Sequence, residues 1–284
     1  MSASANGFTL EELLISRMAK EHRGEILAVG ATICSALAVQ LAKATHAPEL
    51  LVMSDTGGYE SPTSPSITLA GFIGADRGKG RMSWEELFAI VFRHKFSIWV
   101  GPVQIDKHGN SNISAIGDWS RPTAVLIGAR GLPDDSVALE KMLYHVVSHS
   151  PKSFVEKVDF VCGVGYGPAR EEAGLKYGEP GLVVSNLGVF DFDADLKTMR
   201  LQSVHPGVTV EQVQKSTGFE LVIPAHVPET EPPTREEVEL IRTKIDPLGI
   251  RRLQHADRAQ AMAIRLEIMA RERELLTYAF EPAG

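Results

Sequence analysis

The chain has 284 residues, of which 44% are hydrophobic and 23% are charged, as is typical of a soluble globular protein with a large core. Its formal net charge of −7 argues against a nucleic-acid partner, because phosphate binding requires clustered lysine and arginine. No window holds eighteen uncharged apolar residues, and the N-terminus lacks the pattern of a signal peptide. We therefore expect a cytoplasmic protein with no membrane segment.

Four helix starts carry the pattern of a capping box, in which a serine or threonine is followed three residues later by a glutamate or glutamine. These pairs are Thr9 with Glu12, Ser83 with Glu86, Thr209 with Gln212 and Thr234 with Glu237. The first three pairs also carry the flanking apolar residues of a hydrophobic staple. The sequence therefore predicts helices that begin at these points.

Apolar runs alternate with helical patterns along the first two hundred residues. Predicted strands cover residues 25–29, 49–53, 97–100, 123–127, 155–161 and 182–184, a predicted helix covers 32–44, and residues 189–192 and 199–203 suggest a hairpin. This alternation indicates an α/β fold with a mostly parallel sheet and helices on both faces. Both cysteines, Cys34 and Cys162, fall in apolar patterns, which predicts buried thiols rather than a disulfide or a metal site.

The last fifty residues of the sequence differ from the preceding part, because they predict two helices and no strand. A capped helix is predicted over residues 234–244, and a charged helix over 253–280. The apolar side that we expect for the second helix consists of Leu253, Ala256, Ala259, Met262, Ala263, Leu266, Met269 and Ala270. We expect that helix to dock on the body or on a partner subunit, and an exposed apolar face would predict self-association. Residues 1–252 are interpreted as one domain and 253–284 as a helical extension.

Asp55 follows an apolar strand and precedes Gly57 and Gly58. A carboxylate at such a strand end can act as a nucleophile or base, and the glycines allow a ligand to approach the backbone. The alternative is an Asx-turn, in which Asp55 bonds the backbone two residues on.

The densest polar stretch runs from Gly101 to Asn112 and includes Gln104, Asn110 and Asn112. We interpret it as an amide-rich loop that orients a carbonyl or carboxylate. The alternative, for Asp106 to Asn110 alone, is an ordinary β-turn.

Three weaker signals follow. The run Gly128-Ala129-Arg130-Gly131 comes after a predicted strand and would suit an anionic ligand. The glycine-rich run Gly163 to Pro168 lacks a following helix in our prediction, so we do not interpret it as a dinucleotide site. His145 and His149 could share a helical face, but no nearby carboxylate completes a metal triad.

Taken together, these stretches resemble the β subunit of class I coenzyme A transferases of the glutaconate type. The resemblance covers about residues 9–252. It rests on His46-Ala47-Pro48-Glu49, Ser54-Asp55-Thr56-Gly57, Gln104 to Asn112, Gly128 to Gly131, Val183 to Phe190, Ile241-Arg242 and Ile245-Asp246-Pro247.

The resemblance implies the α/β fold of these transferases, which is also called NagB/RpiA-like, and an acyl-CoA thioester as substrate with no permanently bound cofactor. It also implies a homologous α subunit in an α2β2 heterotetramer. Asp55 falls at the position of the family's catalytic glutamate, whose side chain is one methylene longer. The resemblance further implies that Gln104, Asn110 and Asn112 orient the substrate, and that Gly128, Ala129, Arg130 and Gly131 lie near coenzyme A.

A second branch of the family is similar as well. Val184 to Phe192, His205-Pro206-Gly207-Val208-Thr209 and Phe154-Val155-Glu156 resemble the B subunit of the acyl-CoA hydrolase that cleaves rings in bacterial steroid catabolism. In that branch the key glutamate belongs to the other subunit. Two reactions are therefore open: transfer of coenzyme A between carboxylic acids, and hydrolysis of a carbon–carbon bond. A third hypothesis is a non-catalytic subunit that only completes and stabilises its partner.

Overall fold

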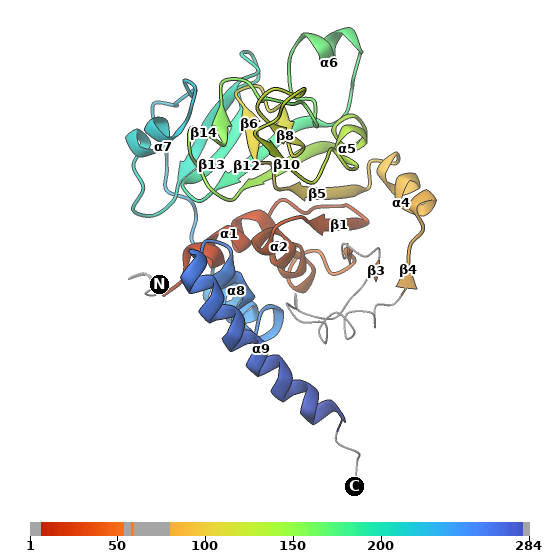
Figure 1. The fold of residues 1–284 in the computed structure, drawn as a ribbon, viewed down its shortest axis with the longest axis vertical. Helices are drawn as coiled ribbons and strands as arrows, with labels where there is room; N and C mark the ends of the chain where they lie inside the picture. The colour runs from red at the N-terminus through yellow and green to blue at the C-terminus, as the bar shows by residue number, and fades with distance from the viewer. Residues whose placement is uncertain (1–6, 54–57, 60–79, 281–284) are drawn as a thin grey trace. The chain divides into compact units, whose positions relative to one another are not determined.

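The structure, a computed structural model, describes residues 7–53, 58–59 and 80–280 of the chain (Figure 1). It divides into two compact units. Unit 1 contains Met1–Leu87 and Pro232–Gly284, and unit 2 contains Phe88–Glu231. The predicted extension 253–284 therefore belongs, by its contacts, to the same unit as the first helices of the chain.

Unit 1 begins with a short parallel strand pair and two helices that pack against each other. At the end of the first strand, a Cβ atom on Gly30 would lie 2.2 Å from the backbone nitrogen of Ala36, so only glycine fits there. The elements are α1 (Leu10–Ala19), β1 (Leu27–Gly30), α2 (Ile33–Ala44) and β2 (Leu51–Val52), followed by the antiparallel pair β3 (Gly58–Tyr59) and β4 (Gly80–Arg81). The next helix, α4 (Trp84–Val91), begins in unit 1 and ends in unit 2.

The last part of the chain returns to unit 1. Glu12 of α1 is fully buried, and its carboxylate accepts hydrogen bonds from Nε of Arg242 at 2.7 Å and from Nη2 of Arg251 at 2.9 Å. Burial alone would raise the pKa of Glu12, but hydrogen bonds from Arg242 and from the backbone of Thr9 hold it below its ordinary value. The returning elements are α8 (Arg235–Leu240), a π-helical turn (Ile241–Ile245), a 3₁₀ turn (Ile250–Leu253) and α9 (Arg258–Phe280).

Unit 2 contains five strands in the order β14-β13-β12-β10-β5. β10 is parallel to both β5 and β12, and the last three strands form an antiparallel meander. Leu143, Tyr144 and Val183 in the middle of this sheet are fully buried, which explains the apolar runs in the sequence. The strands are β5 (Phe96–Val100), β10 (Lys141–Val146), β12 (Glu179–Ser185), β13 (Gly188–Phe192) and β14 (Met199–Val204).

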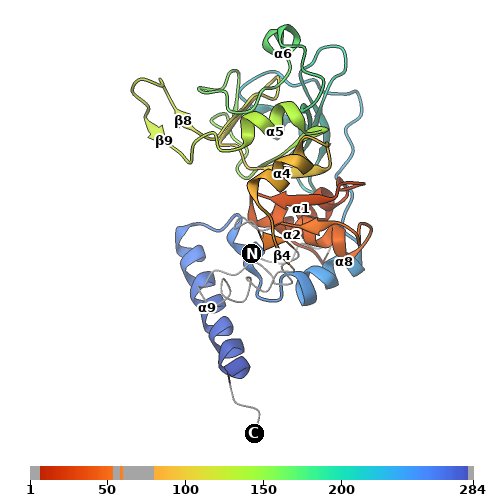
Figure 2. The same cartoon turned by 90° about the vertical axis from the view of Figure 1, so that its right-hand side faces the viewer.

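Short elements surround this sheet. Figure 2 shows the pair β8 and β9 as a ribbon that projects from the rest of unit 2. The short elements are β6 (Gln104–Asp106), β7 (Ser111–Asn112), β8 (Ala115–Ile116), β9 (Ala124–Val125), α5 (Leu132–Ala138), β11 (Phe154–Val155), α6 (Pro168–Glu172) and α7 (Val210–Ser216).

All four predicted capping boxes are confirmed, because each pair exchanges its two hydrogen bonds. A fifth box, between Thr32 and Ser35, closes the start of α2. The mostly parallel sheet with its terminal hairpin is also confirmed. Cys34 and Cys162 are buried free thiols, as predicted.

Two predicted strands are wrong in length. Of residues 123–127, Ala124–Val125 alone form a strand, and Val125 is 78% exposed, so this apolar run belongs to the projecting pair and not to the core. Of residues 155–161, only Val155 is in a strand, as part of β11.

The prediction for the last helix is wrong in its start, and the side that packs on the rest of unit 1 differs from the predicted apolar side. Docking of the predicted side on a partner subunit stays a prediction. The Asp257 carboxylate accepts hydrogen bonds from the backbone of Ala259 and Gln260, so the helix begins after Asp257 and not at residue 253. Its buried residues include Ala261 and Ile268, whereas most of the predicted apolar side is exposed to solvent. Leu253, which precedes the helix, is an exception and packs on Leu248 and Ile250. No described helix combines the length and apolar content needed to cross a lipid bilayer.

Candidate active site

The amide-rich turn between β6 and β7 is shaped by its own carboxylate. Asp106 Oδ1 accepts hydrogen bonds from the backbone N–H groups of His108 and Asn110, both at 3.0 Å, and the Asn110 amide donates to both carboxylate oxygens. The Gly109 N–H donates to the Asp106 carbonyl at 2.9 Å, which closes a β-turn. The turn interpretation of this segment is therefore confirmed. Burial raises the pKa of Asp106 in spite of these bonds.

Gln104 and Asn112 lie opposite each other in β6 and β7, and both are buried. The Asn112 side-chain amide donates to Gln104 Oε1 at 2.8 Å and to the Ala115 carbonyl at 2.7 Å, and Gln104 Nε2 donates to Asp159 at 2.9 Å. These amide groups therefore hold the turn in place. The role of Gln104, Asn110 and Asn112 in orienting a substrate stays a prediction.

The glycine-rich turn at Gly163 to Gly167 packs on the amide-rich turn. Gly165 N–H donates to Asn110 Oδ1 at 2.8 Å, and a Cβ atom on Gly165 would lie 2.3 Å from the His108 carbonyl oxygen. Gly165 is thus required for the close approach of two backbones. Our expectation that no helix follows this turn is wrong, because α6 begins at Pro168.

Arg170 on α6 joins three segments, and sequence reasoning missed it. Its side chain is 4% exposed and donates five hydrogen bonds of 2.6–3.0 Å to backbone carbonyl groups. Burial lowers the pKa of its guanidinium below the ordinary value. The carbonyl groups belong to Ser136, Val164, Gly165, Tyr177 and Gly178.

The loop Gly128-Ala129-Arg130-Gly131 leads into α5, next to the glycine-rich turn. Gly128 and Arg130 have positive φ angles of 85° and 53°, and the Arg130 side chain is exposed. In the described chain, none of the four backbone N–H groups of this loop donates to an acceptor. A Cβ atom on Gly163 would lie 3.2 Å from the Leu132 side chain, so the glycine-rich turn packs on the first residue of α5. An exposed arginine beside unused N–H groups is suited to an anionic group.

Asp135 in the first turn of α5 is a further titratable group that the sequence did not reveal. The residue is 8% exposed, and burial, with a smaller contribution from Asp134, raises its pKa to about 7. A carboxyl group with such a pKa beside a candidate ligand loop can exchange a proton near neutral pH.

Asp55 lies outside the described residues, so its predicted position at the site stays a prediction. The two histidines do not share a helix. His145 is buried in β10, and His149 is buried between the hydroxyl groups of Ser185 and Thr217, at 2.9 Å and 3.0 Å from its ring nitrogens. Burial lowers the pKa of His149 to about 3, so it is a neutral core residue.

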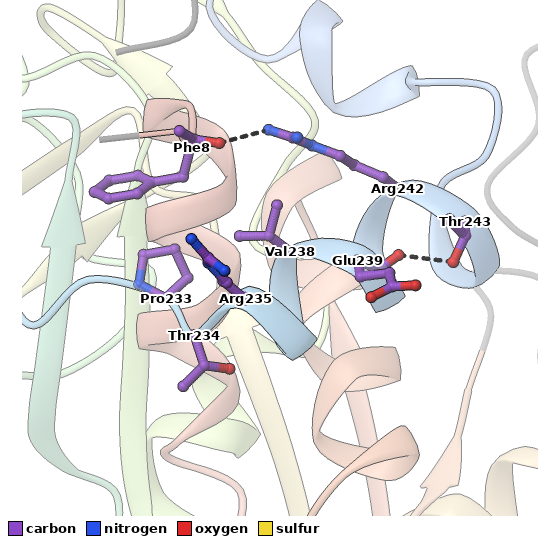
Figure 3. Close-up of a pocket in the computed structure, with 9 residues that line it drawn as sticks. Phe8, Pro233, Thr234, Arg235, Val238, Glu239, Arg242 and Thr243 are labelled. Carbon is purple, nitrogen blue, oxygen red and sulfur yellow. Dashed lines mark hydrogen bonds between the residues drawn. The ribbon is translucent and has the colours of Figure 1, made fainter. Parts of the chain in front are cut away.

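A separate pocket of about 400 Å³ lies in unit 1, beside the start of α8 (Figure 3). Its lining includes Phe8, Val238 and Arg242. The Arg242 guanidinium donates to the Gly7 carbonyl at 3.0 Å and to Glu12 at 2.9 Å, so its donors are engaged within the chain. We therefore assign no chemistry to this pocket.

Comparison with known proteins identifies a family and several relatives. Residues 13–216 match the coenzyme A transferase family. The chain is 35% identical, over 229 residues, to the cholesterol ring-cleaving hydrolase IpdB subunit of Rhodococcus jostii, covering 80% of this chain and 88% of that protein.

Solved structures agree in fold. The crystal structure of Rhodococcus jostii IpdAB aligns with a TM-score of 0.77 and 33% identity, covering 88% of this chain and 99% of that one. Glutaconate coenzyme A-transferase of Acidaminococcus fermentans aligns with a TM-score of 0.74 and 25% identity, covering 84% and 95%. The decarboxylase AibA/AibB aligns with the same TM-score and identity, covering 87% and 98%. One fold thus serves a hydrolase, a transferase and a decarboxylase.

Proposed function

Because the chain belongs to the coenzyme A transferase family, we propose that it is the B-type subunit of a two-subunit enzyme whose substrate is an acyl-CoA thioester. The solved relatives that carry two subunit names support a homologous α partner, and an α2β2 assembly is part of the proposal. Coenzyme A enters as part of the substrate and not as a resident cofactor.

Of the two reactions open from the sequence, the comparisons favour hydrolysis of a carbon–carbon bond in a cyclic CoA ester. The observation that carries this choice is the 35% identity to a ring-cleaving hydrolase subunit, compared with 29% to the glutaconate CoA-transferase B subunit. In this reaction water adds to a ring carbonyl, the adjacent carbon–carbon bond breaks, the released carbanion takes a proton, and a carboxylate forms. Transfer of coenzyme A between carboxylic acids is the second candidate, supported by the same family match.

We assign roles to the site residues accordingly. Arg130 and the backbone N–H groups around it bind an anionic group of the CoA ester. Gln104, Asn110 and Asn112 orient the substrate by fixing the amide-rich turn. In ring hydrolysis the catalytic glutamate comes from the α subunit, and Asp55 is not a nucleophile. In transfer, the Asp55 carboxylate attacks the thioester carbonyl, the carbon–sulfur bond breaks, coenzyme A leaves as its thiolate, and an acyl-aspartyl anhydride forms.

The two reactions are separated by an experiment in ¹⁸O-labelled water. The complex of this chain with its α subunit is incubated with a cyclic CoA ester in the absence of any acceptor acid. Hydrolysis predicts a ring-opened product with one ¹⁸O in its new carboxylate, and Asp55→Ala should retain this activity. Turnover that requires an acceptor acid, together with an adduct at Asp55 trapped by hydroxylamine, would instead establish transfer.

The anion-binding role of Arg130 has its own test. Arg130→Gln should raise KM for the CoA ester about tenfold or more, because one charge-assisted contact to a phosphate is lost. Arg121→Gln, the same change at another exposed arginine of unit 2, is the control and should leave KM within about twofold. Equal effects of the two variants would argue against a specific role for Arg130.

A further inference from the structure

Asp159 joins two segments of unit 2 that are far apart in the sequence. Its Oδ2 accepts a hydrogen bond from Gln104 Nε2 and another from the backbone N–H of Gly117, both at 2.9 Å. The Asp159 N–H donates in return to Gln104 Oε1 at 3.1 Å. Because Gly117 directly follows β8, one carboxylate oxygen connects the amide-rich turn with the projecting pair β8 and β9.

The next residue makes a second contact to the same pair. The ring of Phe160 stacks on Trp119, with ring centroids 4.5 Å apart and an angle of 26° between the planes. Trp119 lies in the connection between β8 and β9 and is 64% exposed. Two consecutive residues, Asp159 and Phe160, therefore hold this connection at two points.

The strand pair carries the anchoring on to the candidate anion loop. β8 and β9 pair antiparallel, and the Leu126 N–H donates to the Ser114 carbonyl at 2.8 Å. Ile127 alone separates Leu126 from the loop Gly128–Gly131. Since backbone hydrogen bonds fix β9 to β8, the bond from Gly117 to Asp159 also limits where β9 ends and the loop begins.

We propose that Asp159 is a positioning residue, which fixes the loop Gly128–Gly131 relative to the amide-rich turn and thereby sets the affinity for the CoA ester. This inference rests on the anion-binding role proposed above for Arg130. Asp159 acts through Gly117 and Gln104, which are 42 and 55 residues away in the sequence, and does not itself bind the substrate.

Both side-chain hydrogen bonds reach the same carboxylate oxygen, so substitution can separate geometry from charge. Asparagine can place its amide oxygen where Oδ2 lies and accept both bonds without a charge. Within the described residues Oδ1 takes part in no hydrogen bond, so an amide nitrogen in its place costs no donor. Asp159→Asn therefore keeps the junction, whereas Asp159→Ala removes it.

Steady-state kinetics of the complex with its α subunit test the positioning role. Asp159→Ala should raise KM for the CoA ester about tenfold and leave kcat within about threefold, because two hydrogen bonds that place the loop are lost. Asp159→Asn should stay within about threefold of wild type in KM. Asp195→Ala, the same change at another exposed aspartate of unit 2, is the control and should have no effect. An unchanged KM for Asp159→Ala, or an equal loss for Asp159→Asn, would overturn the proposal.

A double-mutant cycle with Arg130→Gln shows whether Asp159 acts through the loop. Arg130→Gln should raise KM less in the Asp159→Ala background than in wild type, because the loop is already misplaced there. Additive effects would overturn the proposal. An unchanged KM for Arg130→Gln in wild type would overturn the anion-binding role and this inference with it. A normal effect of Arg130→Gln without any effect of Asp159→Ala would overturn the inference alone.

Hydrogen–deuterium exchange tests the junction without any turnover. The Gly117 amide should exchange at least about tenfold faster in Asp159→Ala than in wild type, since its acceptor is lost, and at nearly the wild-type rate in Asp159→Asn. An exchange rate at Gly117 that is the same in wild type and Asp159→Ala would overturn the proposed anchoring of the strand pair.

Discussion

Replacing Asp135 with asparagine is expected to stabilise the protein at neutral and higher pH. Asp135 is 8% exposed, and burial, with a smaller contribution from Asp134, raises its pKa from 3.8 to about 7. Ionising this carboxyl group therefore costs free energy in the folded protein that it does not cost in the unfolded chain. Asparagine has the same shape without the charge, so Asp135→Asn removes the cost.

The size and the pH range follow from the shift. The difference between 3.8 and about 7 is about three pKa units, and at about 1.4 kcal/mol per unit the cost reaches at most about 4 kcal/mol. Since the folded-state pKa is raised, the stability contributed by the protonated carboxyl group is complete below the unfolded value. It is lost as the pH rises through about 7. The advantage of Asp135→Asn should therefore grow from pH 4 to pH 7 and then level off.

Urea unfolding of wild type and variant at pH 4.5, 6 and 8 measures this dependence. Asp134→Asn is the control, because Asp134 is the exposed neighbour, and its effect on the free energy of unfolding should stay within about 0.5 kcal/mol. An advantage of Asp135→Asn that is equal at pH 4.5 and pH 8 would refute the argument from ionisation.

Three further predictions follow from buried groups and caps. Arg170→Met should reduce the free energy of unfolding by at least about 3 kcal/mol, because five carbonyl groups lose their hydrogen-bond donor. Urea unfolding measures this loss, and a value below about 1 kcal/mol would contradict the prediction. Thr209→Ala should cost about 1 kcal/mol through the lost cap of α7, and Thr209→Ser should restore most of it, as thermal unfolding can measure. Cys34 and Cys162 should not react with a thiol reagent until the protein unfolds, because both thiols are buried and burial raises the pKa of Cys34. Rapid labelling of either cysteine in the native protein would contradict this prediction.

Local signals predicted the structure best. The capping boxes at Thr9, Ser83, Thr209 and Thr234 depend on residues three positions apart, so the sequence contains everything that forms them. The same holds for the turn at Asp106, whose carboxylate bonds its own loop.

Features that depend on distant contacts could not be predicted in this way. The sequence shows two stripes at helical spacing on α9, and only the packing on Leu248 and Ile250 decides which one is buried. The pair His145 and His149 fits a helix by spacing, yet β10 ends at Val146, and neighbours 36 and 68 residues away hold His149. Arg170 likewise donates hydrogen bonds to carbonyl groups of separate segments, such as those of Ser136 and Gly178, and only the folded chain brings these segments together.

The hydrogen bonds between Glu12 and Arg251 have a consequence for the order of synthesis. Unit 2 is a continuous stretch of chain, whereas unit 1 needs residues from both sides of it. At roughly 5–20 residues per second, a ribosome needs roughly 10–40 s to add the roughly 200 residues between β2 and Arg251. During that interval α1 and α2 have emerged without the arginines that neutralise Glu12, while unit 2 can fold as it leaves the exit tunnel. Synthesis of unit 2 is therefore complete before the two arginines that bind Glu12 join the chain.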